Sequence, residues 1–250
     1  MPRYLITIEY DGADYIGWQR QKKGNSIQQS IEEAAGAVLG GTEPVPIFGA
    51  GRTDARVHAT AQAAHIDLPN EFDPLKLPLA LNAYLDPTIR VLTARKVADD
   101  FHARFDAIGR AYRYKIYTRH IASPLLAGRV WHVPADLDLA AMQDGATRLI
   151  GTHDFTSFRA RHCQSLSPVR TIDTLYFEEN GDGMISLIVE AKSFLHHQIR
   201  NFAGTLVQVG KGKWTADDVT AAIAAEDRAA GGPTAPAEGL YLTKVVYPED

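Results

Sequence analysis

The order of predicted strands and helices limits the fold of this chain most, because the same order occurs in both halves. Residues 4–9 alternate between apolar and polar side chains, as in a half-buried strand, and end at a turn. A helix is predicted to start at Ile27, since Ser26 can cap it and Gln29 can complete a capping box. The other elements of the first half are strands at 45–48, 59–68 and 88–97 and a short helix at 79–84. Together they have the order β-α-β-β-α-β.

The second half repeats this order with little similarity in sequence. Residues 110–117 predict a strand with aromatic side chains on one face and basic side chains on the other. The remaining predicted elements are a helix at 138–150, a hairpin of strands at 169–177 and 184–191, helices at 194–209 and 216–225, and a strand at 239–247. We therefore predict an α+β fold of two ferredoxin-like (RRM-like) units with antiparallel sheets, at residues 1–107 and 108–250. In such a unit the helices cover one face of the sheet and leave the other open to a partner.

Between the second and third predicted strands lies a loop, residues 49–62, that combines glycines with charged residues. It holds Arg52, Arg56 and a single carboxylate, Asp54. A lone aspartate on a turn can simply form an Asx turn or cap the next element. The two neighbouring arginines favour an ionised carboxylate, which can act as a nucleophile, a base or a metal ligand. The glycines lack the Gly-Lys-Ser/Thr ending of a nucleotide-binding loop, so turn geometry explains them better.

Composition restricts the class of protein. The chain is 45% hydrophobic and 22% charged, and no apolar run reaches the ~20 residues that a membrane span requires. The first residues lack a signal-peptide pattern, so we expect a cytoplasmic protein. The single cysteine, Cys163, excludes an intramolecular disulfide and a multi-cysteine zinc site. Although the net charge is −4, residues 101–170 hold ten Lys and Arg against five Asp and Glu, which fits a phosphate-binding face or simply a solvated one.

Further candidate residues lie in the second half. His196 and His197 fall in the helix predicted at 194–209, where adjacent side chains point about 100° apart, so we assign no metal to them. Arg200 follows one turn after His196, on the flank of the apolar stripe of the same helix. A partly buried arginine at that position needs a carboxylate partner.

Two connections, residues 118–135 and 151–168, are longer than the usual 2–6 residues, and such loops are commonly functional or disordered. The second combines aromatic and basic side chains, which suits RNA bases and phosphates but also suits a packed surface loop. These side chains are Phe155, Phe158, Arg159, Arg161 and His162. A third segment, residues 229–237, consists mainly of small residues and has no evident chemistry.

Several blocks of this sequence resemble those of the A-type tRNA pseudouridine synthases, and they occur in the same order. The similarity runs from Tyr4 to Tyr247, and residues 49–55 and 57–59 match the signature loop of the family. The further blocks are residues 101–105, 112–114, 154–159, 196–201 and 237–242. Several blocks in register are far more specific than any one of them.

The resemblance implies an isomerase that converts uridine to pseudouridine at positions 38–40 of the tRNA anticodon stem-loop, as a homodimer and without a metal or cofactor. It implies that Asp54 is the catalytic aspartate, that Tyr112 stacks on the target base and that Arg200 pairs with Asp54. It also implies that Arg52 helps to displace the target base from the RNA helix. The active-site cleft would then lie between the two units.

One position departs from the family pattern, because Arg56 stands where glycine is usual. If the backbone there has a positive φ, an arginine costs about 1 kcal/mol relative to glycine. Alternatively, Arg56 adds a phosphate contact. The chemistry expected of Asp54 does not depend on this choice.

Two other functions compete with the enzyme. A non-catalytic RNA-binding module of two RRM-like units would bind RNA through open sheets and aromatic residues and leave uridine unchanged. An aspartate-dependent hydrolase of a phosphorylated metabolite would need metal ligands that we do not find in the sequence.

Overall fold

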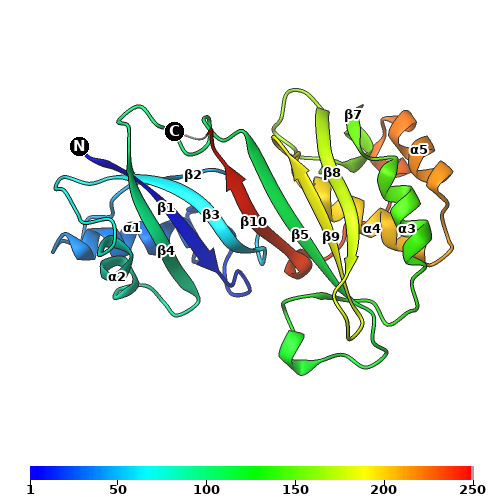
Figure 1. Cartoon of the computed structure of the whole chain (residues 1–250), viewed down its shortest axis with the longest axis horizontal. Coiled ribbons are helices and arrows are strands. Elements are labelled where there is room, and N and C mark those ends of the chain that lie inside the picture. The colour runs from blue at the N-terminus through cyan, green and yellow to red at the C-terminus, as the bar shows by residue number, and fades with distance from the viewer. Residues whose placement is uncertain (249–250) are drawn as a thin grey trace. The chain divides into compact units, whose positions relative to one another are not determined.

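The structure, a computed structural model, describes residues 1–248. The chain forms two compact units: Met1–Ile108 together with the segment that begins at Tyr241, and Gly109–Leu240. Each unit combines helices with a mostly antiparallel sheet, so the predicted α+β class is confirmed (Figure 1). None of the helices in the described part of the chain is long and apolar enough to cross a membrane.

The sheet of the first unit is built around its first strand. Its strands are β1 (Arg3–Tyr10), β2 (Ile47–Gly49), β3 (His58–Asp67) and β4 (Ile89–Val97). β1 pairs antiparallel with both β3 and β4, and β2 pairs antiparallel with β3, so the spatial order is β4-β1-β3-β2. β10 (Leu240–Val246) pairs in parallel with β3, with Tyr241 opposite His58. We predicted this last strand as part of the second unit, whereas the segment from Tyr241 belongs with the first.

Two helices, α1 (Ile27–Val38) and α2 (Leu77–Asn82), belong to the first unit and pack against each other (Figure 1). The cap predicted for α1 is present, since the backbone N–H of Gln29 donates to Oγ of Ser26 over 3.2 Å. The side chain of Gln29 donates to Glu33 instead of returning to the cap. The start of α1 was therefore predicted correctly, although only one of the two hydrogen bonds expected of a capping box is present.

The other face of this sheet is partly covered, although we predicted an open face. Leu5 points away from the neighbouring Ile6 on β1 and belongs to a small apolar cluster that includes Ala103. The N–H of Ala103 donates to Nδ1 of His65 over 3.1 Å, and its carbonyl accepts the hydroxyl of Tyr247 at 2.7 Å. The segment after β4 is thus fastened across this face.

The second unit has a four-stranded antiparallel path with a short side strand. The strands are β5 (Gly109–Tyr117), β7 (Gly151–Asp154), β8 (Val169–Glu179) and β9 (Met184–Ala191), in the order β5-β9-β8-β7. β6 (Trp131–His132) pairs in parallel with β5. β6 and β7 were not predicted, and they lie in the two long connections. Both are too short to show a periodic pattern in the sequence.

Three helices pack beside this sheet, α3 (Leu139–Thr147), α4 (Gln198–Gly210) and α5 (Ala216–Ala225) (Figure 1). α3 contacts β8, α4 and α5. Thr215 and Asp218 form a complete capping box at the start of α5. The side chains of the predicted apolar stripe are all buried; Ile199, Phe202 and Leu206 lie on α4, and Leu195 lies just before it.

The aromatic side chains of the connection at residues 151–168 are buried and so are not exposed for stacking on RNA bases. Phe155 and Phe158 are fully buried, and each ring centroid lies 5.3 Å from that of Phe202. These two rings therefore belong to the core of the second unit. Of the side chains that we considered for RNA contact in this loop, only the polar ones are accessible, and Arg161 and His162 are exposed.

Candidate active site

The loop that carries Asp54 connects β2 to β3 and is tied to the middle of β3. The N–H of Ala50 donates to the carbonyl of Ala63 over 2.7 Å. The side-chain amide of Gln62, which is fully buried, donates to the carbonyl of Gly51 over 2.9 Å. The first residues of the loop therefore have fixed positions relative to the sheet of the first unit, and the loop ends where β3 begins, at His58.

Residues 11–18, which follow β1, form a backing segment that lies directly behind the loop and bonds to its middle. The N–H of Trp18 donates to the carbonyl of Thr53 over 3.0 Å, and the N–H of Arg56 donates to the carbonyl of Tyr15 over 3.3 Å. The hydroxyls of Tyr10 and Thr53 lie 2.7 Å apart and form a buried hydrogen bond. Buried backbone groups need partners, so these bonds favour one conformation of the loop on either side of Asp54.

Two glycines allow this close approach. A Cβ atom at Gly17, where φ is +108°, would lie 2.6 Å from the carbonyl oxygen of Thr53. A Cβ atom at Gly12 would lie 2.1 Å from the carbonyl oxygen of Val57. We did not identify this backing segment from the sequence, although its two glycines before a capped helix are a visible signal. No side chain fits between segment and loop at these two points.

His58, the first residue of β3, belongs to the frame of the loop. It is 2% exposed, and its Nδ1 accepts the N–H of Gly12 over 3.0 Å. Its ring stacks on that of Tyr241, with the centroids 4.6 Å apart. His58 thus joins the loop, the backing segment and β10 within the first unit.

Asp54 begins a four-residue turn in which the N–H of Val57 donates to its carbonyl over 3.2 Å. Asp54 is half-buried, whereas Arg52 and Arg56 are exposed. Arg56 has φ +66°, so the positive φ that we considered for this position is present. The third residue of such a turn favours glycine when its φ is positive. The departure from the family pattern therefore falls on a strained backbone position.

Tyr112 lies on β5 in the second unit, opposite Val189 of β9. It is 9% exposed, and its ring meets that of Phe194 edge to face, with the centroids 5.3 Å apart. Tyr114, two residues further on the same face, is fully buried, and its hydroxyl donates to the carbonyl of Pro236 over 2.7 Å. Both tyrosine rings are thereby held by neighbours within their own unit.

The helix that carries Arg200 starts later than predicted, at Gln198, because His197 takes a left-handed conformation with φ +63°. His196 and His197 precede the helix, and their ring centroids are 4.0 Å apart. The geometric reason we gave against a shared ion assumed that both lie within a helix, so it does not apply to this pair.

Arg200 is held by the small-residue segment to which we had assigned no chemistry. Its Nε donates to the carbonyl of Ala235 over 2.8 Å, and its own carbonyl accepts the N–H of Ala235 at 3.0 Å. A Cβ atom at Gly204 would lie 1.7 Å from the carbonyl oxygen of Pro233, so this segment lies against α4. The segment at residues 229–237 thus positions the guanidinium group of Arg200.

Burial raises the pKa of Tyr114 well above its usual value, and the positive charge of Arg200 opposes this rise.

The predicted site residues are divided between the units. Arg52, Asp54 and Arg56 share one loop of the first unit, and Tyr112 and Arg200 belong to the second. Each group is fixed within its own unit by the contacts above. The pairing of Asp54 with Arg200 stays a prediction.

Comparison with known proteins identifies the family. The family described as tRNA pseudouridine synthase matches residues 6–106 and 146–248, which include the Asp54 loop and α4. The chain belongs to the tRNA pseudouridine synthase family. Proteins named tRNA pseudouridine synthase A from Zymomonas mobilis subsp. mobilis and Rhodopseudomonas palustris (strain HaA2) are 51% and 53% identical to it, over 99% of this chain and 100% of each relative. The protein is therefore an isomerase that acts on tRNA.

Between its two matched segments, the family match leaves out residues 107–145 of this synthase. It contains β5, with Tyr112, and the connection at residues 118–135. The full-length relatives nevertheless align across this stretch, since the Rhodospirillum centenum protein named tRNA pseudouridine synthase A is 51% identical over 248 residues.

Proposed function

We propose that this synthase converts uridine to pseudouridine at positions 38–40 of the tRNA anticodon stem-loop, with Asp54 as the catalytic carboxylate. The observation that carries the proposal is the half-buried Asp54 on a turn that the backing segment and β3 hold from both sides, in a chain of this family. Tyr112 stacks on the target base and Arg200 pairs with Asp54. Arg52, which is exposed on the same loop, helps to displace the base from the RNA helix.

The reaction explains why these residue types are needed. The C–N glycosidic bond of uridine breaks, the detached uracil turns, and a C–C bond forms between its C5 and the ribose, while the C5 proton is lost and a proton is gained at the former glycosidic nitrogen. No atom is added or removed, so no co-reactant is required. A carboxylate at the reacting ribose can bond to the anomeric carbon, stabilise its positive charge or remove a neighbouring ribose proton. A stacked tyrosine prevents the loss of the detached base.

Arg200 has a separate electrostatic role in this proposal. A carboxylate that loses water when RNA covers it becomes harder to ionise. A guanidinium group that is already fixed by Ala235 can offset this effect without losing side-chain freedom on binding. The pairing would place the site in a cleft between the two units, each of which we infer to be ferredoxin-like. The strand order β4-β1-β3-β2 of the first unit supports this inference.

The test is the Asp54→Asn variant, with Asp14→Asn as the matched control. Asp14 is exposed in the backing segment, so its substitution removes a carboxylate close by in the same unit. Mass spectrometry of treated tRNA should find pseudouridine at positions 38–40 with the wild type and the control, and none with Asp54→Asn, which should still bind tRNA. Activity near the wild-type level in Asp54→Asn would contradict the proposed role. Binding without any pseudouridine in the wild type would instead indicate a non-catalytic RNA-binding protein.

We also propose that the synthase is a homodimer. The family resemblance and the partly uncovered sheet face of the first unit support this assembly. Analytical ultracentrifugation at micromolar concentration should give a mass twice that of the 27.4 kDa chain. A monomer under these conditions would reject the dimer. A tRNA substrate agrees with the cytoplasmic location that we expect.

A further inference from the structure

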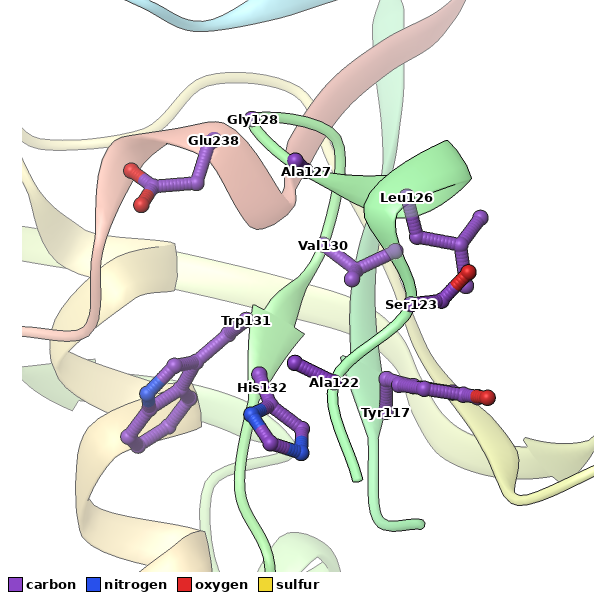
Figure 2. Close-up of a pocket in the computed structure, with 10 residues that line it drawn as sticks. All are labelled: Tyr117, Ala122, Ser123, Leu126, Ala127, Gly128, Val130, Trp131, His132 and Glu238. Carbon is purple, nitrogen blue, oxygen red and sulfur yellow. The ribbon is translucent and has the colours of Figure 1, made fainter. Parts of the chain in front are cut away.

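A cavity of about 300 Å³ lies in the second unit beside the end of β5 (Figure 2). Its walls come from β5, the connection at residues 118–135, β6, and the turn before β10. The lining includes three residues with rings, Tyr117, Trp131 and His132, and one acidic residue, Glu238, whose carboxylate points away from the others in Figure 2. Its volume is at the lower end of the roughly 300–1,000 Å³ of small-molecule sites, so it suits one planar ring better than a larger ligand. None of these residues has a role in the proposed reaction.

The wall of this cavity has a defined structure. β6 pairs with β5 through Ile116 and Trp131, and the N–H of Val133 donates to the carbonyl of Tyr117 over 2.8 Å. Nε2 of His132 lies 2.7 Å from the carbonyl of Arg119. A carbonyl can only accept, so Nε2 carries the proton, and Nδ1 of a neutral His132 is left as an acceptor.

The connection at residues 118–135, which supplies most of the cavity wall, is positively charged. Residues 118–135 contain two arginines and two histidines but no aspartate or glutamate. Arg119, His120 and Arg129 are exposed, and the guanidinium group of Arg119 lies 5.3 Å from the centre of the Tyr117 ring. The rings that line the cavity suit a nucleobase, and the basic side chains of the adjoining connection suit the phosphates on either side of it.

We propose that this cavity binds an unpaired nucleobase of the tRNA substrate other than the target uridine, with the adjacent phosphates at Arg119 and Arg129. The proposal rests on the proposed function, because tRNA is the ligand. The base enters beside Trp131 and Tyr117, and its polar edge meets the side chain of His132, which Figure 2 shows between them. All lining residues except Glu238 lie in the stretch that the family match leaves out, so the cavity adds a contact outside the shared catalytic frame.

The first test fills the cavity or removes the basic side chains of the adjoining connection. Ala122 lines the cavity and is exposed, so Ala122→Phe places a ring where the base would go. The Arg119→Ala/Arg129→Ala pair removes the charges. Each change should raise KM for tRNA about tenfold, within the range for one stacked base, and leave kcat unchanged. A control with Lys211→Ala and Lys213→Ala removes two exposed charges elsewhere in the unit, and its KM should stay within about twofold.

The second test measures the cavity without the reaction. Trp131 lines the cavity, so a single-stranded uridine tetranucleotide should quench tryptophan fluorescence in the wild type but not in Trp131→Phe. An abasic tetranucleotide and inorganic phosphate should leave the signal unchanged. Equal quenching by the abasic probe, or normal KM and normal quenching in Ala122→Phe, would overturn the proposal. Since this readout needs no catalysis, a wild type that makes no pseudouridine would refute the proposed function and leave the cavity test intact.

Discussion

Replacing Arg56 by glycine should stabilise the first unit, whereas replacing it by alanine should not. Arg56 has φ +66° in the turn that starts at Asp54, and its side chain is exposed. Arginine and alanine both carry a Cβ atom and bear the same backbone strain there, and only glycine avoids it. The two substitutions remove the same charge, so comparing them isolates the backbone.

The magnitude follows from two opposing terms. The left-handed conformation costs a residue with a Cβ atom about 1–2 kcal/mol. The unfolded chain is more flexible with glycine than with alanine, and this difference lowers the stability of the glycine variant by about 0.4–1 kcal/mol. The difference leaves Arg56→Gly more stable than Arg56→Ala by about 1 kcal/mol, which for a chain of this size corresponds to about 2–4 °C in Tm. Arg56→Asn should fall between them, because asparagine tolerates this region better than most residues.

The assay is urea unfolding of the variants, followed by tryptophan fluorescence. Glu226, at the end of α5, has φ +48° and offers a positive control, since Glu226→Gly should exceed Glu226→Ala by a similar amount. Equal stability of the glycine and alanine variants at residue 56, with a clear difference at residue 226, would refute the strained turn. If both variants at residue 56 also lose tRNA affinity equally, Arg56 supplies a phosphate contact as well.

Three further perturbations test other parts of the structure. Burial lowers the pKa of His65 from 6.5 to about 4. The unfolded chain therefore binds a proton at His65 before the folded one does, so the free energy of unfolding should be unaffected by this residue above pH 6.5 and fall by about 2.5 kcal/mol by pH 4.5. Urea titrations should show this loss in the wild type and not in His65→Gln. Gly17→Ala should lower the free energy of unfolding by at least about 2 kcal/mol and reduce kcat, because its Cβ atom would meet the backbone of the Asp54 loop. In the control Gly51→Ala, the new Cβ atom has nothing within 4 Å, so the free energy of unfolding should change by less than about 0.5 kcal/mol. Phe202→Ala should destabilise the second unit by about 3–5 kcal/mol in urea unfolding, and a loss below 1 kcal/mol would contradict the aromatic core.

The elements that could be predicted are those whose signals are local. Ser26 caps α1, and α5 occupies residues 216–225 as predicted, because a cap and an apolar periodicity act within a few residues. The start of α4 could not be predicted in this way. Oε1 of Gln198 accepts the N–H of Leu195 over 2.8 Å, and His197 turns left-handed between them. Nothing in the composition around these residues separates this turn from a continuing helix.

The site could be predicted in part for a similar reason. Asp54 and Arg52 stand out because charged residues beside loop glycines are visible in one stretch of sequence. The roles of Gly12 and Gly17 depend on contacts with residues 36–45 positions away, and the role of Ala235 depends on Arg200, 35 positions before it. Such contacts use backbone atoms, which every residue type supplies, so side-chain patterns do not report them. Phe155 and Phe158 show the converse, because their aromatic character alone does not separate a core from a binding surface.

The segment behind the Asp54 loop determines how this synthase can be recombined with its relatives. A relative without glycine at the positions of Gly12 and Gly17 could not receive residues 49–58 of this chain alone, because a Cβ atom there would lie 2.1 Å from the carbonyl oxygen of Val57 or 2.6 Å from that of Thr53. Residues 10–18 and 49–58 therefore form one exchangeable module, although 30 residues, including α1, separate them in the chain.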